Sequence, residues 1–156
     1  NPVALPYFNF SYPEPTGVVS AITPNESSLI GLVSIVAPII AGGNTVVLLA
    51  SEENPLCSIT FAEVLHTSDV PSGVVNILTG HRSELIDQFS SHMDVNAIVY
   101  CGNEPEEIKL VQENAALNVK RPIVYSNENW LNKNTQDPYR ILNTLETKTT
   151  WHPVGV

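Results

Sequence analysis

The sequence predicts an α/β fold: a five-stranded parallel sheet flanked by helices, with a small β flap formed by the two ends of the chain. Short, continuously apolar segments alternate with helical segments across short connections, which is typical of parallel sheets with right-handed crossovers. The most informative junction is residues 35–48, where an apolar helix ends at Gly42-Gly43 and, after Asn44, runs into a β-branched strand. Glycine commonly ends helices, so this junction indicates a helix followed directly by a sheet strand.

The alternating pattern predicts five strands, in the order Val18–Ile22, Thr45–Leu49, Val74–Leu78, Val95–Tyr100 and Arg121–Tyr125. Four helices are expected between them. The first contains Leu29 to Val36, is apolar nearly all round and hence buried, and is expected to be capped by a hydroxyl of Ser27 or Ser28. The other three are expected at Ser58–Leu65, Ser83–Phe89 and Pro105–Leu117.

The two chain ends lie outside this α/β pattern. Residues Tyr7–Tyr12 and Thr147–Trp151 alternate between two faces and carry aromatic groups, which is typical of short half-buried strands. The stretch between the last sheet strand and the C-terminal strand is polar and rich in Asn, and Ile141–Leu145 is either a helical turn or a strand. We therefore divide the chain into 1–16 (flap strand), 17–125 (α/β domain), 126–143 (polar loop) and 144–156 (C-terminal strand).

The composition excludes several functional classes. The chain has 156 residues, a formal net charge of −9 and no basic run, which argues against nucleic acid and anionic membranes as partners. Two cysteines, Cys57 and Cys101, form neither a disulfide framework nor a metal-binding pattern, so we expect no metal and a reducing, cytoplasmic location. The apolar stretch Leu29–Ile40 is too short to span a bilayer. We expect no signal peptide, and because the sequence begins with Asn we expect a piece of a longer chain.

A series of motifs occurs in a recognisable order: Gly17-Val18-Val19, Pro24, the Ala37-to-Val47 junction, Ser51-Glu52, Val70 through Gly80, Asp94-Val95 and Gly102. From about residue 17 to 125 this order resembles the cofactor domain of the aldehyde dehydrogenase superfamily. The tail 145–150 resembles that superfamily's C-terminal oligomerisation strand, and the N-terminal strand resembles the other part of its flap. The resemblance implies a Rossmann-like NAD(P)-binding fold. It also suggests the degenerate second module of a tandem, family-16-like aldehyde dehydrogenase.

The positions that would carry catalysis in the resembled family are altered. Glu26 stands where the family has an oxyanion-stabilising Asn, and a carboxylate repels a developing oxyanion. Tyr125 begins the run that replaces the family's general-base Glu motif, and tyrosine is a poor base near neutral pH. In the resembled family the nucleophilic Cys belongs to a downstream catalytic domain, which we expect this chain to lack, while Cys57 and Cys101 are interpreted as structural. We therefore predict no catalytic residue.

The resemblance assigns two cofactor-binding residues, Glu52 to the adenosine ribose and Gly102 to the pyrophosphate, both interpreted as vestigial. Leu49 replaces the family's ribose-binding Lys, which removes a charge-assisted hydrogen bond of roughly 1.5–3 kcal/mol. Three carboxylates surround the start of the following helix and repel phosphate: Glu104, Glu106 and Glu107. We expect no cofactor for this chain.

One basic spot lies near the strand ends, at His81-Arg82. Arg82 could contact a phosphate, but the favoured interpretation pairs it with a neighbouring acid such as Glu84. The remaining histidines, His66, His92 and His152, are isolated in the sequence and are expected to be surface or capping residues.

The preferred hypothesis is a non-catalytic aldehyde dehydrogenase-like domain that acts in assembly or scaffolding of a larger aldehyde dehydrogenase. Its partner would be another protein module or a second copy, bound through the end strands. The alternative is the NAD(P)-binding part of an aldehyde-oxidising enzyme whose catalytic domain lies elsewhere. A stand-alone nucleotide-binding protein is the weakest hypothesis, because the family's Lys and its phosphate-compatible helix start are both lost.

Overall fold

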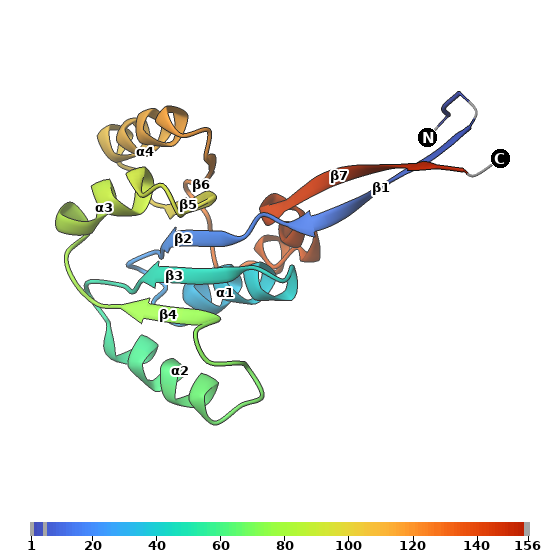
Figure 1. Cartoon of the computed structure of the whole chain (residues 1–156). Coiled ribbons are helices and arrows are strands. Elements are labelled where there is room, and N and C mark those ends of the chain that lie inside the picture. Colours follow the sequence, from blue (N-terminus) through green and yellow to red (C-terminus); the bar gives the residue numbers. More distant parts are fainter. Residues whose placement is uncertain (1, 5, 155–156) are drawn as a thin grey trace.

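The computed structural model describes residues 2–4 and 6–154. A body built on a parallel sheet carries a long two-stranded arm that extends away from it, formed by the first and the last of its strands (Figure 1). Residues 1, 5, 155 and 156, which belong to the expected end segments, lie outside the described residues. In the described part of the chain, no helix is both long and apolar enough to cross a membrane.

The predicted five-stranded parallel sheet is confirmed, with strand order β4-β3-β2-β5-β6. The strands are β2 Val18–Ile22, β3 Thr45–Leu49, β4 Val75–Leu78, β5 Ala97–Cys101 and β6 Arg121–Tyr125. All four neighbouring pairs are parallel. The expected start of β5 at Val95 was two residues too early, because the Val95 N–H closes a turn onto the His92 carbonyl at 3.1 Å.

Helices cover the two faces of the sheet in pairs (Figure 1). Helices α1 (Ile30–Ala41) and α2 (Leu56–His66) contribute to one apolar core, and α3 (Arg82–Ser91) and α4 (Pro105–Leu117) contribute to the other. Leu32, Ile35, Val36 and Ile39 of α1 are at most 2% exposed, as expected of this apolar helix, but Leu29 and Ile30 at its start are 49% and 40% exposed, so its burial is not complete. Helix α1 ends as predicted at the glycine pair, where Gly43 adopts φ +85°.

The expected serine cap of α1 is wrong. Leu29 occupies the N-cap and no side chain caps the helix. The backbone carbonyl of Ser27, rather than a serine hydroxyl, accepts from the Gly31 N–H at 2.9 Å, so the chain already turns before the helix begins. The other expected helices are present: α4 matches the expected bounds Pro105–Leu117, whereas α2 begins two residues before Ser58 and α3 begins at Arg82 rather than at Ser83.

The two chain ends pair with each other as antiparallel strands β1 (Tyr7–Pro15) and β7 (Leu145–Pro153), in a register that runs from Tyr7 opposite Pro153 to Pro15 opposite Leu145. This is the flap that the sequence predicts. Between β6 and β7 lie two short 3₁₀ helices, η1 (Lys133–Thr135) and η2 (Pro138–Thr144). The open alternative for residues 141–145 is thus resolved as a 3₁₀ turn followed by the start of β7.

Asn44 attaches the arm to the body. Its side-chain oxygen accepts from the Gly17 N–H at 2.9 Å, and its Nδ2 donates to the Thr144 carbonyl at 3.0 Å. The Thr16 N–H also donates to that carbonyl, at 3.1 Å. Asn44 is 2% exposed, so one buried amide joins the start of β2 to the start of β7.

Candidate functional site

The carboxyl edge of the sheet holds a crevice between the two central strands. The strand order reverses between β2 and β5, because the chain leaves β2 toward β3 on one side and leaves β5 toward β6 on the other. Open α/β sheets bind ligands at such a switch point. A cleft of about 240 Å³ lies there, and its lining includes Asn25, Arg82, Gly102 and Tyr125. Four carboxylates also line it: Glu26, Glu53, Glu104 and Glu128.

Arg82 is the central side chain of this edge. It is the first residue of α3, and its guanidinium Nη2 donates to the Thr23 carbonyl at 3.1 Å and to the Cys101 carbonyl at 3.2 Å. These carbonyls stand at the carboxyl ends of β2 and β5, so one guanidinium joins both strands across the switch point. Its Nη1 faces the Glu107 carboxylate at 3.5 Å. The prediction that Arg82 pairs with Glu84 is therefore wrong. Its acidic partner is Glu107, which belongs to α4.

Glu107 also binds Tyr100. The Tyr100 hydroxyl donates to Glu107 Oε2 at 2.6 Å, and the Arg82 guanidinium lies 5.4 Å from the centre of the Tyr100 ring. Burial, together with the hydrogen bond to Glu107, raises the pKa of Tyr100 well above its ordinary value. The hydroxyl therefore stays protonated and acts as a donor near neutral pH.

The two residues that the resemblance assigns to a cofactor, Glu52 and Gly102, both contact Arg82. The Glu52 carboxylate accepts from the backbone N–H of Arg82 and lies 3.8 Å from His81 Nδ1. At Gly102, a side-chain Cβ would lie 2.6 Å from the Tyr100 hydroxyl and 2.9 Å from Arg82 Nη1. The chain's own polar side chains thus occupy the side of Gly102 on which a Cβ would stand. Leu49, at 1% exposed, packs in the core of the α3–α4 face.

Tyr125, at the position of the family's general base, is held on three sides. Its hydroxyl accepts from Asn143 Nδ2 at 2.7 Å, the Arg140 guanidinium lies 4.3 Å from its ring centre, and the Trp130 ring meets it edge-on at 6.0 Å. Burial raises the pKa of Tyr125. A neutral phenol in this environment cannot act as a base near pH 7.

The loop that the sequence predicts as polar contains a buried anchor, which sequence reasoning missed. Trp130 is 2% exposed and packs in the core on the α1 side. Arg140 lies 5.1 Å from the Trp130 ring centre and forms an ion pair of 3.2 Å with Glu128. A lone Trp in an Asn-rich stretch was the available signal, because a large aromatic residue usually packs against a core.

The cysteines and histidines do not form a second site. Cys101 is buried at the end of β5, and burial raises the pKa of its thiol, which makes it a poor nucleophile. Cys57 is half-buried as the second residue of α2. Among the described residues, no group of His, Cys, Asp and Glu is arranged to hold a metal. His92 caps α3, and His152 stacks on Phe10 in the arm with ring centres 5.8 Å apart.

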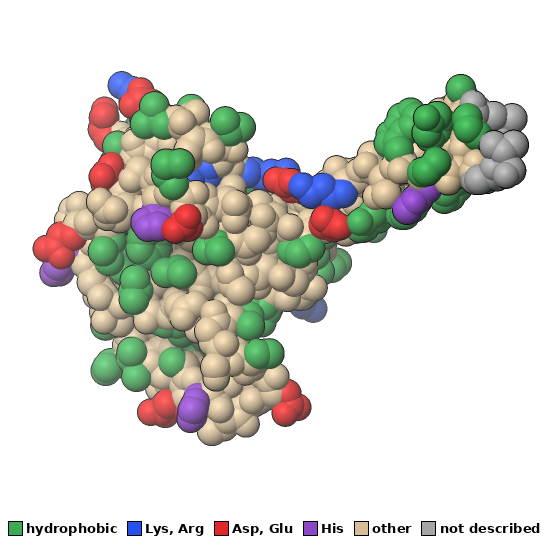
Figure 2. All heavy atoms as spheres, viewed as in Figure 1, with side chains coloured by type: hydrophobic (Ala, Val, Ile, Leu, Met, Phe, Trp, Pro, Cys, Tyr) green, Lys and Arg blue, Asp and Glu red, His purple; other side chains and the backbone are tan. Residues whose placement is uncertain are grey.

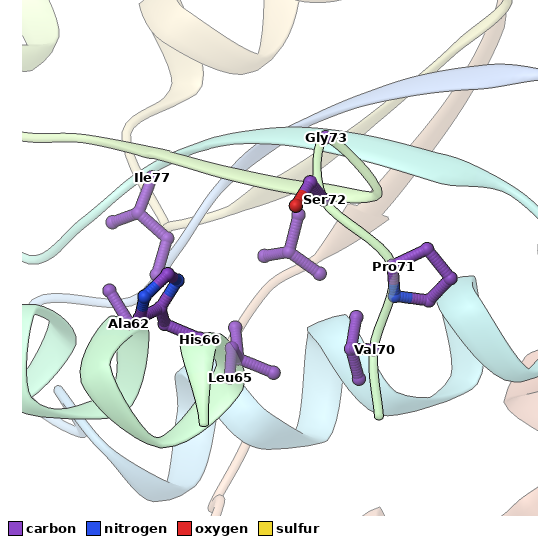
Figure 3. A pocket seen from close by; sticks show the side chains of 9 residues that line it. Ala62, Leu65, His66, Val70, Pro71, Ser72, Gly73 and Ile77 are labelled. Atoms are coloured by element: carbon purple, nitrogen blue, oxygen red, sulfur yellow. The ribbon is translucent and has the colours of Figure 1, made fainter. Parts of the chain in front are cut away.

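His66 lies in a separate pocket of about 290 Å³ between the end of α2 and the turn that precedes β4. Figure 3 shows the side chains of α2 and of the turn on opposite sides of this pocket, where the polar side chains are those of His66 and Ser72. The other lining groups are apolar or glycine, so this pocket offers a ligand no Lys, Arg, Asp or Glu side chain.

The outer half of the arm carries hydrophobic side chains, whereas charged side chains gather where the arm joins the body (Figure 2). Phe8, Phe10 and Tyr12 form one aromatic row, with ring centres 5.7 and 5.5 Å apart. On the other side Tyr7 meets Trp151 edge-on at 6.1 Å. Phe8 and Trp151 are 57% and 58% exposed, so this apolar area is largely unburied in the chain alone.

A doubly wound parallel sheet with a crevice at its switch point defines the class of Rossmann-like domains. Within that class, the chain belongs to the aldehyde dehydrogenase family, whose model matches residues 2–125. Cytosolic aldehyde dehydrogenase 1 of Elephantulus edwardii is 36% identical over 121 residues, which are 77% of this chain and 24% of that protein. Human aldehyde dehydrogenase 1A1 is 34% identical over 121 residues, with the same coverage of 77% and 24%.

Solved structures agree. A variant of aldehyde dehydrogenase C from Pseudomonas syringae, solved with NAD+ and octanal, superposes with a TM-score of 0.72 and 36% identity over 76% of this chain and 24% of its own. The chain thus spans about a quarter of the length of these relatives.

Proposed function

We propose that this chain is a non-catalytic aldehyde dehydrogenase-like domain that acts in the assembly of a larger aldehyde dehydrogenase, as the second module of a tandem, family-16-like enzyme would. The observation that carries the proposal is the arm: two strands that leave the body and expose aromatic groups on both sides. Exposed apolar area of this kind marks surfaces that bind another protein. The partner is another protein module or a second copy, contacted through β1 and β7.

The chemistry of the crevice supports the absence of catalysis. Glu26 is exposed in the crevice, where a developing oxyanion would meet a carboxylate instead of a hydrogen-bond donor. Tyr125 is a neutral phenol whose hydroxyl is already engaged by Asn143. Cys101 is buried under the sheet edge and does not present a thiolate. We therefore propose that the chain has no catalytic residue of its own.

The contacts of Glu52 and Gly102 do not fit a dinucleotide. A pyrophosphate needs an open helix start and unopposed donors, whereas Tyr100 and Arg82 cover Gly102 and the Glu107 carboxylate faces Arg82. Glu52 is engaged by the Arg82 backbone. We therefore propose that both residues are vestigial and that no cofactor binds. The free cysteines are also consistent with a cytoplasmic location, which we propose as well.

Sedimentation velocity over a concentration series, with and without the parent module, tests assembly. The double variant Phe8→Ser/Phe10→Ser removes two exposed aromatic groups but keeps the strand pair, and it should weaken association at least about tenfold. Trp151→Ala, and separately a truncation after Leu145, should do the same and leave the α/β body folded. Tyr139→Ser is the matched control, because Tyr139 is 72% exposed on the body rather than on the arm. The proposed role in assembly would be refuted if the wild-type chain stays monomeric at high concentration and does not bind the parent module.

The second candidate is the NAD(P)-binding part of an aldehyde-oxidising enzyme that receives its catalytic domain from elsewhere. It is favoured by family membership and by solved relatives that contain NAD+. Calorimetric titration of NAD and NADP into the wild-type chain separates the two. Heat of binding at micromolar concentration would support this candidate, and its absence up to millimolar cofactor would support the non-catalytic module.

A further inference from the structure

We infer that Glu107 is an internal anion that closes the anion-binding corner beside the crevice: its carboxylate occupies the positive site formed by Arg82, the Tyr100 hydroxyl and the start of α4. The inference deepens the proposed absence of cofactor binding and rests on it. It assigns the closure to one side chain and makes the crevice self-inhibited, with its anion-binding groups intact but already engaged.

The geometry around Glu107 supports this assignment. Its Oε2 accepts a short hydrogen bond of 2.6 Å from Tyr100 and lies 3.5 Å from Arg82 Nη1. Glu107 is the third residue of the 13-residue helix α4, in the turn where the helix dipole favours negative charge. A phosphate at a helix start in an α/β sheet would use the same three features, which are a guanidinium, a hydroxyl donor and a helix N-terminus.

The guanidinium is fixed in place from its other side. Arg82 is 13% exposed at its side chain, and its Nη2 is held by the carbonyls of Thr23 and Cys101. This positions Nη1 toward α4 whether or not Glu107 carries a charge. If Glu107 lost its charge, the carbonyls of Thr23 and Cys101 would still hold the Arg82 guanidinium in place. Its Nη1 would then be available to an incoming anion.

The other carboxylates of this edge do not share the arrangement. Glu106 precedes Glu107 in the same turn of α4 but is exposed and has no ion pair among the described contacts. Glu106 and Glu107 thus oppose an incoming phosphate equally through net charge, and only Glu107 opposes it by occupying Arg82. This difference provides a matched pair of variants.

Calorimetric titration of inorganic pyrophosphate tests the inference. The wild-type chain and Glu106→Gln should bind pyrophosphate weakly and alike. Glu107→Gln should bind it roughly ten- to a hundredfold more tightly, because a charge-assisted hydrogen bond to Arg82 becomes available. The double variant Glu107→Gln/Arg82→Gln should lose that gain. Circular dichroism and thermal melting confirm that each variant is folded before it is titrated.

Equal gains in Glu106→Gln and Glu107→Gln would overturn the inference, since net charge alone would then explain them, and so would the absence of any gain in folded Glu107→Gln. If Glu107→Gln does not fold, Glu107→Asp replaces it. That variant keeps every charge and the Tyr100 hydroxyl but shortens the side chain by one methylene, which draws the carboxylate away from Arg82, and affinity equal to wild type would refute the closure. Micromolar NAD binding to the wild-type chain would refute the proposed function itself, whereas a wild type without NAD binding and a Glu107→Gln without pyrophosphate gain would refute only this inference.

Discussion

Replacing Trp130 by Ala should destabilise the α/β body strongly, although Trp130 lies outside every regular helix and strand. The side chain is 2% exposed and packs in the core against α1 and the sheet. Burying a Trp removes about 150–250 Å² from water, which at about 25 cal/mol per Å² stabilises by roughly 4–6 kcal/mol as an upper estimate. Measured Trp→Ala substitutions in cores cost about 3–5 kcal/mol. We expect the free energy of unfolding to fall by about 4 kcal/mol.

Urea unfolding followed by far-UV circular dichroism measures this loss without depending on tryptophan fluorescence. In a chain of this size each kcal/mol corresponds to about 2–4 °C, so the melting temperature should fall by roughly 8–16 °C. The other tryptophan provides the control. Trp151 is 58% exposed on the arm, and Trp151→Ala should change the unfolding free energy of the monomer by no more than about 0.5 kcal/mol.

A loss below about 1 kcal/mol for Trp130→Ala would refute the reasoning. It would mean that residues 126–143 lie over the sheet edge without belonging to the cooperative fold. Equal losses for the two tryptophan variants would contradict it as well, because the argument depends on the difference in burial between them.

Three further predictions concern the core and the crevice. Ile39→Ala, at a position 2% exposed in α1, should lower the unfolding free energy by about 2–5 kcal/mol in urea melts, and a mild shift would contradict its burial. Leu49→Lys places an unpaired ammonium where the side chain is 1% exposed; it should cost several kcal/mol in thermal melts and leave calorimetric NAD affinity at the wild-type level. Burial raises the pKa values of Tyr100 and Tyr125, so the unfolded chain loses these protons first, near pH 10. Stability should therefore fall as pH rises above about 10, and Tyr100→Phe should reduce that slope in urea melts at successive pH values; an unchanged slope would show that Tyr100 does not contribute.

The strands of the body were predictable because their signals are local. Thr45–Leu49 is β-branched or apolar throughout, follows a glycine pair and matches β3 residue for residue. The antiparallel pairing of the two ends was predictable for a related reason, since each end alternates and carries aromatic groups that need a neighbouring strand. Boundaries that depend on turns were less accurate, and Val95 is an example because its backbone N–H bonds to His92.

The partner of Arg82 was not predictable from neighbouring residues. Glu84 is nearest in sequence, but side chains two positions apart on a helix do not face each other. Glu107 lies 25 positions away, and it reaches Arg82 because β5 places the start of α4 beside the start of α3. The anchoring of residues 126–143 was equally remote, since Trp130 packs in a core that α1 and several strands of the sheet form together.

The crevice and the arm differ in how much free energy a binding partner could gain there. At the crevice, Arg82, Tyr100, Glu107 and Glu52 are engaged with one another or with backbone groups, so a ligand would first have to break those contacts. On the arm, Phe8 and Trp151 remain more than half exposed, and covering them requires no contact to be broken. At about 25 cal/mol per Å², burying such aromatic surface favours association directly. A binding partner is therefore expected at the arm rather than at the crevice. The more strongly Glu107 holds Arg82 and Tyr100, the larger this difference in binding free energy becomes.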